Sequence, residues 1–348
     1  MSRSRPRHLL VLASIGCALG ALTANAAQSL PEAVRTLDAK YLDVPEIDAN
    51  EETAKIEAGD WEEEAPVPEP QEIEQGPLRV TLTYRESTGE NGMEGDMVQS
   101  ASEEGADVAA PEQRISRIPI VTVFADGEEV AKLEGDPGSP DPPVAVQIAE
   151  LDPSNATPEV VVSFYTGGAH CCSDTKLVTR KADGSGWETI EVGTFDGGPL
   201  TAIDLDGNGV YEFETRDNAF LYAFGCYACS AAPLQVLALE DGKMKNVSSD
   251  PRFRRAHEVW LKDLFASAPE EEANGFLAGY VGQKVRLGEG KQAWALMLDH
   301  YDRKSDWGLE VCEQPMNETG ECPVPTALVE FPDALERMLN ENGYMLEN

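Results

Sequence analysis

Apolar and polar positions alternate along the middle of the chain in a pattern that predicts β-strands. LRVTLTYR at residues 78–85 puts apolar and polar side chains on opposite faces, as in a strand with one buried face. IPIVTVFADGEEVAKLEG at 118–135 predicts a hairpin, because Asp126-Gly127 is a favoured two-residue turn. Similar runs continue to about residue 247, with turns at Asp183-Gly184 and Asp241-Gly242. We therefore predict that 78–250 is a mainly β domain, either a sandwich or propeller-like.

After Pro251 the apolar residues recur at helical spacing. RRAHEVWLKDLFASA, EEANGFLAGYVGQKVRLG and GKQAWALMLDHYDRK each carry such a stripe, and Phe331-Pro332-Asp333 is typical of a helix start. Gly343 stands where the C-terminus of a helix favours glycine. We interpret 251–348 as a C-terminal module of three or four helices, with the aromatic stripes as its core.

The start of the chain has the order of a secretory signal peptide over residues 1–26. Arg3, Arg5 and Arg7 precede an apolar run, and Ala24-Asn25-Ala26 fits a small-residue cleavage site. The alternative is a lipoprotein acylated at Cys17. No stretch reaches the length of a membrane-spanning helix. We expect an exported protein, periplasmic or secreted, without a transmembrane segment.

Two polar stretches are predicted to lack regular structure. Residues 27–77 are rich in Glu, Asp and Pro and are predicted to form a disordered acidic linker, with a short helix within 31–41. Such a composition buries too little apolar surface to offset the entropy cost of ordering. Residues 86–113 are predicted to be a long mobile loop that interrupts the strands.

Two segments of the β region can be aligned as an internal repeat. VQIAELDPSNATPEVVVSFYTGGAHCCS begins at Val146, and LTAIDLDGNGVYEFETRDNAFLYAFGCYACS begins at Leu200. In this alignment Glu159 matches Glu212, and both segments have an acidic loop, a strand and a cysteine pair. The period of about 55 residues is close to that of one four-stranded propeller blade. The region 78–135 is a candidate third, degenerate unit.

The second copy contains IDLDGNGVYEF, which has oxygen-bearing side chains at alternate positions. Ca²⁺ takes six to eight oxygen ligands, and this spacing lets a loop wrap around the ion. Thr215 stands where an EF-hand needs glutamate, and strands flank the loop, so a structural site is favoured over a sensor. A polar turn with an aspartate cap is the alternative. The predicted Ca²⁺ ligands are Asp204, Asp206, Asn208, the Val210 carbonyl and Glu212.

This loop, followed by a strand, resembles the calcium loop of FG-GAP and VCBS-type repeats, the blades of integrin-α-like propellers. The resemblance covers about 100 residues, and the first copy lacks the loop glycines. It implies a Ca²⁺-stabilised, propeller-like β domain that serves as a binding platform. Two or three units are too few to close a ring, so we expect a partial propeller.

Cleavage after residue 26 would leave six cysteines, an even number that suits disulfides in an oxidising compartment. The alignment favours cross-repeat disulfides among the first four, for which three pairings exist. A Zn²⁺ or copper site that includes His170, or a redox-active cysteine pair, is a less favoured alternative. Cys312 and Cys322 enclose a short loop and are predicted to pair. The disulfide candidates are Cys171, Cys172, Cys226, Cys229, Cys312 and Cys322.

Charge narrows the range of partners. The chain has 63 acidic and 27 basic residues, a net charge of −36. Such a surface repels nucleic acids and anionic membranes, so neither is an expected partner. Solubility or adaptation to salt explains the charge without a partner, and attraction of cations or of a basic protein is the alternative.

The sequence contains no G-x-S-x-G, P-loop or H-E-x-x-H motif. We therefore expect a non-catalytic exported binding or structural protein that engages an envelope or extracellular protein or a glycan. The alternatives are a hydrolase with a loop-built site on the β domain and a thiol- or metal-handling protein that uses the cysteines. A candidate ligand site comprises His170, Tyr301, Asp302, Asp306 and Trp307.

Overall fold

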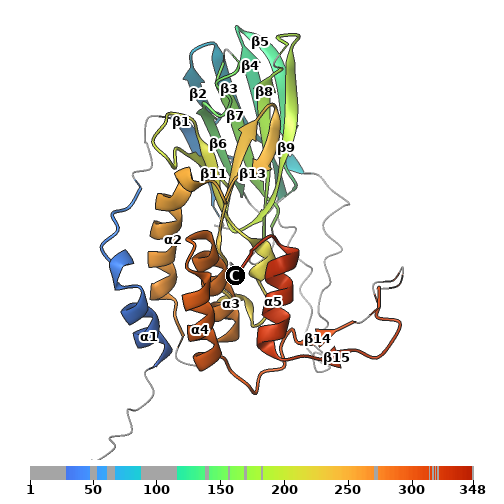
Figure 1. Ribbon diagram of the computed structural model, residues 1–348. Coiled ribbons are helices and arrows are strands. Elements are labelled where there is room, and N and C mark those ends of the chain that lie inside the picture. Colours follow the sequence, from blue (N-terminus) through green and yellow to red (C-terminus); the bar gives the residue numbers. More distant parts are fainter. Residues whose placement is uncertain are drawn as a thin grey trace, which may run out of the picture.

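A computed structural model shows a mainly β region followed by a C-terminal helical region (Figure 1), as predicted from the sequence. It describes residues 29–47, 53–60, 67–87, 116–137, 141–155, 157–167, 171–181, 183–269, 273–312, 314–315, 317, 319 and 321–346. The predicted signal peptide, residues 88–113 of the predicted loop, and His170 lie outside the described residues.

The β region consists of antiparallel sheets that stack face to face. The first has the order β2-β3-β4-β5: Gln71–Gln75, Leu78–Ser87, Ser116–Ala125 and Glu128–Glu134. The central sheet has the order β1-β6-β7-β8-β9: Ala54–Asp60, Asp141–Ala149, Glu159–Tyr165, Cys171–Arg180 and Trp187–Asp196. The third has the order β10-β11-β12-β13: Ala202–Ile203, Glu212–Arg216, Leu234–Glu240 and Lys243–Asn246. The strands of the described residues close no propeller ring.

Strand β7 shows why the central sheet is covered on both faces. Its sequence EVVVSFY is buried over its first six residues, because successive side chains point to opposite faces and both faces meet another sheet. Val160 and Val162 belong to the core shared with the first sheet, whereas Val161 belongs to the core shared with the third.

The hairpin predicted at Asp126-Gly127 is present between β4 and β5.

The helical region contains α2 (Arg254–Ala266), α3 (Asn274–Arg286), α4 (Gly290–His300) and α5 (Phe331–Glu341), with the short pair β14 (Glu310–Val311) and β15 (Ala327–Leu328). Helix α3 is central, and its first eleven residues are buried. Two glycines of α3 have no room for a side chain. A Cβ added at Gly275 would lie 2.6 Å from the Cys229 carbonyl oxygen, and one added at Gly279 would lie 2.2 Å from the Ala231 carbonyl oxygen. These glycines allow the chain around residues 229–231 to pack directly on α3.

The prediction of a disordered linker over 27–77 is wrong for the described part of this segment. Helix α1 (Leu30–Leu37) packs beside α2 and α4, and β1 and β2 join two sheets (Figure 1). The acidic composition concealed Leu30, Val34 and Tyr41, which are buried in the core of the helical region. Just after α1, Asp38 forms a fully buried ion pair with Lys284 of α3.

A buried polar network joins the third sheet to the helices. Gln283 of α3 accepts a hydrogen bond from the backbone N–H of Leu234, the first residue of β12, at 2.9 Å. The side-chain amide of Gln283 lies 3.1 Å from Nδ1 of His257, and Nε2 of His257 lies 2.7 Å from the Ser248 carbonyl oxygen. A neutral imidazole with its proton on Nε2 satisfies both contacts, because it donates to the carbonyl and accepts from the amide.

This network predicts a pH dependence of stability. Burial lowers the pKa of His257 to about 4 from its ordinary value of 6.5. The unfolded chain therefore binds more protons at His257 than the folded chain in this range, so the contribution of His257 to the free energy of unfolding falls as the pH drops from 6.5 towards 4. The full difference corresponds to about 3 kcal/mol. In urea titrations across this range, we expect His257→Gln to show a smaller loss than the wild type and His300→Gln to behave like the wild type. An identical loss in His257→Gln would show that another group is responsible.

Candidate functional site

The candidate site is the loop that joins β10 to β11. Asp204 directly follows β10, and its carboxylate accepts the backbone N–H groups of Gly207 at 2.8 Å, Asn208 at 3.0 Å and Gly209 at 2.9 Å. The two glycines have φ angles of +76° and +85°, which residues with a side chain rarely adopt. The loop is therefore wound around the Asp204 carboxylate.

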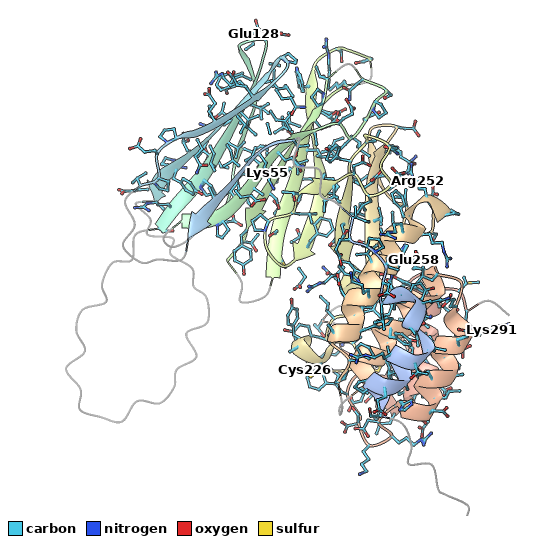
Figure 2. All side chains as sticks on the ribbon, turned by 90° about the vertical axis from the view of Figure 1, so that its left-hand side faces the viewer. Lys55, Glu128, Cys226, Arg252, Glu258 and Lys291 are labelled. Carbon is cyan, nitrogen blue, oxygen red and sulfur yellow. A yellow bond between two sulfur atoms is a disulfide. The ribbon has the colours of Figure 1, made fainter. Side chains whose placement is uncertain are left out.

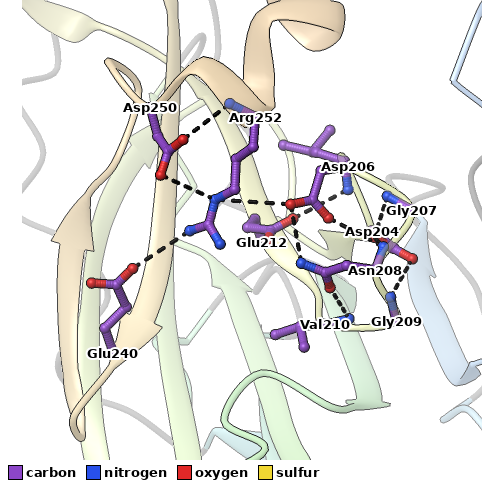
Figure 3. A network of polar contacts seen from close by, with 11 residues as sticks. Asp204, Asp206, Gly207, Asn208, Gly209, Val210, Glu212, Glu240, Asp250 and Arg252 are labelled. Carbon is purple, nitrogen blue, oxygen red and sulfur yellow. Dashed lines mark hydrogen bonds and ion pairs between the residues drawn. The ribbon is translucent and has the colours of Figure 1, made fainter.

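Three acidic side chains meet at this loop (Figure 3). Asp204, Asp206 and Glu212 each offer a carboxylate oxygen, and these oxygens lie within 4.8 Å of one another. Asp204 and Glu212 are buried, with exposed fractions of 5% and 1%. Burial raises the pKa of Glu212 to about 7, and the charges of Asp206 and Asp204 add to this rise. The arrangement concentrates negative charge where water is largely excluded.

Arg252 supplies positive charge next to this cluster. Its Nε atom lies 3.8 Å from Oδ2 of Asp206, and its guanidinium also contacts Asp250 at 3.4 Å and Glu240 at 3.5 Å (Figure 3). Arg252 lies two residues before α2, so it connects the loop to the start of the helical region. The single positive charge of Arg252 is shared among several carboxylates and therefore does not neutralise the cluster.

The first copy of the repeat satisfies its buried glutamate with protein donors. Glu159 is fully buried at the start of β7 and accepts the N–H of Leu151 at 2.8 Å and that of Asp152 at 3.0 Å. The Asn155 amide at 2.7 Å and the Thr179 hydroxyl at 2.9 Å donate to its other oxygen. Burial raises the pKa of Glu159, and these hydrogen bonds oppose the rise. This carboxylate has no need of a cation.

The second copy keeps the glutamate but lacks these donors. Glu212 at the start of β11 accepts the N–H of Leu205 at 3.2 Å, the counterpart of the bond from Leu151. This is the one hydrogen bond that the Glu212 carboxylate accepts within the described part of the chain. The Asn208 amide donates instead to Asp206, at 3.0 Å. Acidic residues stand near the glutamate in both copies, Asp204 and Asp206 in the second and Glu150 and Asp152 in the first. The difference is that an amide and a hydroxyl also reach the glutamate in the first copy.

Three of the five predicted Ca²⁺ ligands are thus brought together. Asn208, a fourth predicted ligand, lies in the same loop, where its side-chain oxygen accepts the Val210 N–H at 2.6 Å. The chemistry of the three carboxylates nevertheless fits a hard cation that prefers oxygen ligands. Arg252 was missed in the sequence because it lies 40 residues beyond Glu212 and no local motif marks it.

The prediction of cross-repeat disulfides is wrong for the second cysteine pair. Cys226 is bonded to Cys229, because the short 3-10 turn Tyr227–Cys229 brings their Cα atoms to 4.9 Å, within reach of a direct bond. Neither sulfur in this disulfide can act as a thiolate ligand for Zn²⁺ or copper. Cys172 is disulfide-bonded as well. A further disulfide joins Cys312 to Cys322, the pair that the spacing predicts.

Part of the candidate ligand site lies at one cavity. Asp302, Asp306 and Trp307 line a cavity of about 330 Å³ together with Cys226 and Cys229. Tyr301 is instead part of the packing of the helical region, with its ring 5.9 Å from that of Phe331.

Comparison with known proteins assigns this β domain with its helical C-terminal region to a family. The family described as "sll0997 C-terminal domain" matches residues 254–343, which run from the start of α2 to just beyond α5. The chain is 41% identical over 235 residues to the "Probable thylakoid lumen protein sll0997" of Synechocystis sp., covering 66% of this chain and 69% of that protein. The chain therefore belongs to the sll0997 family.

A second relative is the protein y4bJ of Sinorhizobium fredii, which is 37% identical over 238 residues. The match covers 66% of this chain but 37% of y4bJ. No solved structure matches the chain significantly. Among the described residues, no helix has the length and apolar character needed to cross a membrane.

The first copy of the loop predicts a loss of stability on substitution that does not depend on Ca²⁺. Asn155→Ala removes a donor from the buried Glu159, and leaving such a group short of a partner costs about 1–3 kcal/mol. We expect this loss in urea unfolding to be the same in EDTA and in Ca²⁺. Recovery of stability in Ca²⁺ would instead mean that the first loop also takes a cation.

Proposed function

We propose that this protein is a binding protein of an exported or lumenal compartment, whose β region is held in shape by one Ca²⁺ ion at the β10–β11 loop. The observation that carries the proposal is the meeting of Asp204, Asp206 and Glu212 within 4.8 Å, two of them buried.

Charge balance supports a divalent cation at this loop. Three ionised carboxylates carry a charge of −3, and Arg252 offsets part of it at 3.8 Å. Without further compensation, burial and mutual repulsion favour protonation of Glu212, as its raised pKa indicates. A bound Ca²⁺ would keep all three side chains ionised and replace the missing donors with metal–oxygen bonds.

The position of the loop supports a structural role. Leu205, next to Asp204, packs in a small core with Leu234 and Val236 of β12 and with Phe253 and Ala256 at the start of the helical region. A cation bound above this core would hold the third sheet and, through Arg252, the first turn of α2. We propose that the ion braces the joint between the two regions.

The hydrogen bonding of the two loops supports the internal repeat, on which the proposed relation to FG-GAP and VCBS-type repeats rests. In both copies a glutamate at the start of a strand accepts the N–H of a leucine in the preceding loop. We propose that the sheets descend from such units and form a stacked, propeller-like arrangement that presents loops to a partner.

The proposed compartment follows from a relative and from the disulfides. The Synechocystis relative carries the name of a probable thylakoid lumen protein. The disulfides of this chain suit an oxidising compartment on the far side of a membrane. We propose a protein or a glycan as the partner, since repeat surfaces of this type commonly serve as binding platforms.

The proposal is tested by thermal unfolding in EDTA and in excess Ca²⁺. At a free Ca²⁺ concentration of 100 times Kd, binding to the folded state alone adds about 2.7 kcal/mol to the free energy of unfolding. We expect Tm to rise by about 5–10 °C in the wild type. Asp206→Asn and Glu212→Gln should abolish the rise, because each removes an ionised ligand at little change in shape.

Asp250→Asn is the matched control, since Asp250 contacts Arg252 without belonging to the cluster. It should keep the response to Ca²⁺. The proposal fails if the wild type shows no rise, or if Asp206→Asn and Glu212→Gln respond to Ca²⁺ as the wild type does.

A further inference from the structure

The disulfide between Cys226 and Cys229 lies beside a cavity that the calcium loop does not involve. The cavity has a volume of about 330 Å³, and both cysteines line it together with Asn274, Lys304 and Trp307. Both cysteines are half-buried, so solvent reaches the pair. Figure 2 shows Cys226 at the edge of the molecule, beside the helical region.

The turn that carries these cysteines is held by bonds other than the disulfide. The Cys229 N–H donates to the Cys226 carbonyl at 3.0 Å, and the Ser230 hydroxyl donates to the same carbonyl at 2.9 Å. The next residue, Ala231, donates its N–H to the Gly275 carbonyl of α3 at 3.3 Å. Reduction of the disulfide would therefore leave the two sulfurs side by side and ready to bond again.

The short spacing of these two cysteines limits how much their disulfide can stabilise the folded protein. A disulfide stabilises a protein mainly by restricting the unfolded chain, and the restriction grows with the length of the closed loop. Cys226 and Cys229 are three residues apart, whereas Cys312 and Cys322 are ten apart. The shorter bridge can open with less loss of stability than the longer one.

Exposed aromatic side chains surround the pair. Trp307 is 49% exposed, and its indole N–H donates to the Tyr222 carbonyl at 2.9 Å. Tyr222 is 52% exposed, and its ring lies 5.5 Å from that of Tyr227, inside the Cys-x-x-Cys turn. Aromatic surface of this kind suits the side chains of an unfolded polypeptide.

We propose that Cys226–Cys229 is a redox-active disulfide that exchanges with a dithiol in a partner polypeptide. The backbone of Cys229 lies directly against α3, where a Cβ at Gly275 would be 2.6 Å from the Cys229 carbonyl oxygen. We therefore assign Cys226 as the sulfur that is attacked. A substrate thiolate attacks Sγ of Cys226, the Cys226–Cys229 bond breaks, and Cys229 leaves as a thiolate. The second substrate thiolate then attacks the substrate sulfur of this mixed disulfide and releases Cys226.

The exchange transfers two electrons from the substrate dithiol to this protein. The substrate gains a disulfide and loses two thiol protons, and the two thiolates of Cys226 and Cys229 take up two protons. No metal or other cofactor enters the balance.

The test equilibrates the folded protein with glutathione buffers and measures each disulfide by alkylation and peptide mass spectrometry. We expect Cys226–Cys229 to be half reduced at a ratio of [GSH]² to [GSSG] at least tenfold lower than Cys312–Cys322 requires, with Tm nearly unchanged. In Cys229→Ser, oxidised glutathione should form a mixed disulfide on Cys226, with release of one reduced glutathione, at least tenfold faster than it forms one on Cys229 in Cys226→Ser.

Reduced ribonuclease serves as the polypeptide dithiol. In glutathione buffer the wild type should accelerate formation of its disulfides, Cys226→Ser should not, and the double variant Cys312→Ser/Cys322→Ser should match the wild type. Equal reduction of the two bridges, or reduction that unfolds the protein, would overturn the proposal. Exchange with glutathione but without ribonuclease oxidation would overturn its assignment to polypeptide substrates.

Discussion

The β region depends on the burial of one glutamate at the start of a strand in each copy of its repeat. Glu159 and Glu212 each accept the N–H of a leucine in the preceding loop, and each is almost completely buried. This bond fixes the loop against the strand. It also places a carboxylate where water cannot solvate it, and a buried charge is tolerated only when other groups compensate it.

The two copies meet this constraint differently. Glu159 accepts hydrogen bonds from four neutral donors, the Asn155 amide, the Thr179 hydroxyl and two N–H groups, although Glu150 and Asp152 lie nearby. Glu212 stands beside two further carboxylates, and burial raises its pKa to about 7. The cation proposed above would compensate its charge. In the first copy, protein donors satisfy the buried glutamate. The second is a candidate metal site, and Arg252 links it to the helices that follow.

The sequence predicted the class of fold and the three carboxylates because both depend on local patterns. Alternation marked the strands, the change of period after Pro251 marked the helices, and the spacing of Asp204, Asp206 and Glu212 marked the loop. Contacts between distant segments were not predictable. Composition concealed the burial of Leu30 and Val34, and no local signal connects Arg252 to the loop or pairs Cys226 with Cys229 rather than with the first copy.

The central claim is that one Ca²⁺ ion binds where the second loop lacks donors. Isothermal titration calorimetry of the metal-free protein with Ca²⁺ tests it most directly. We predict one ion per chain in the wild type, the same in Asp152→Asn of the first loop, and no saturable binding in Asp206→Asn of the second. Absence of binding to the wild type, or unchanged binding in Asp206→Asn, would contradict the claim.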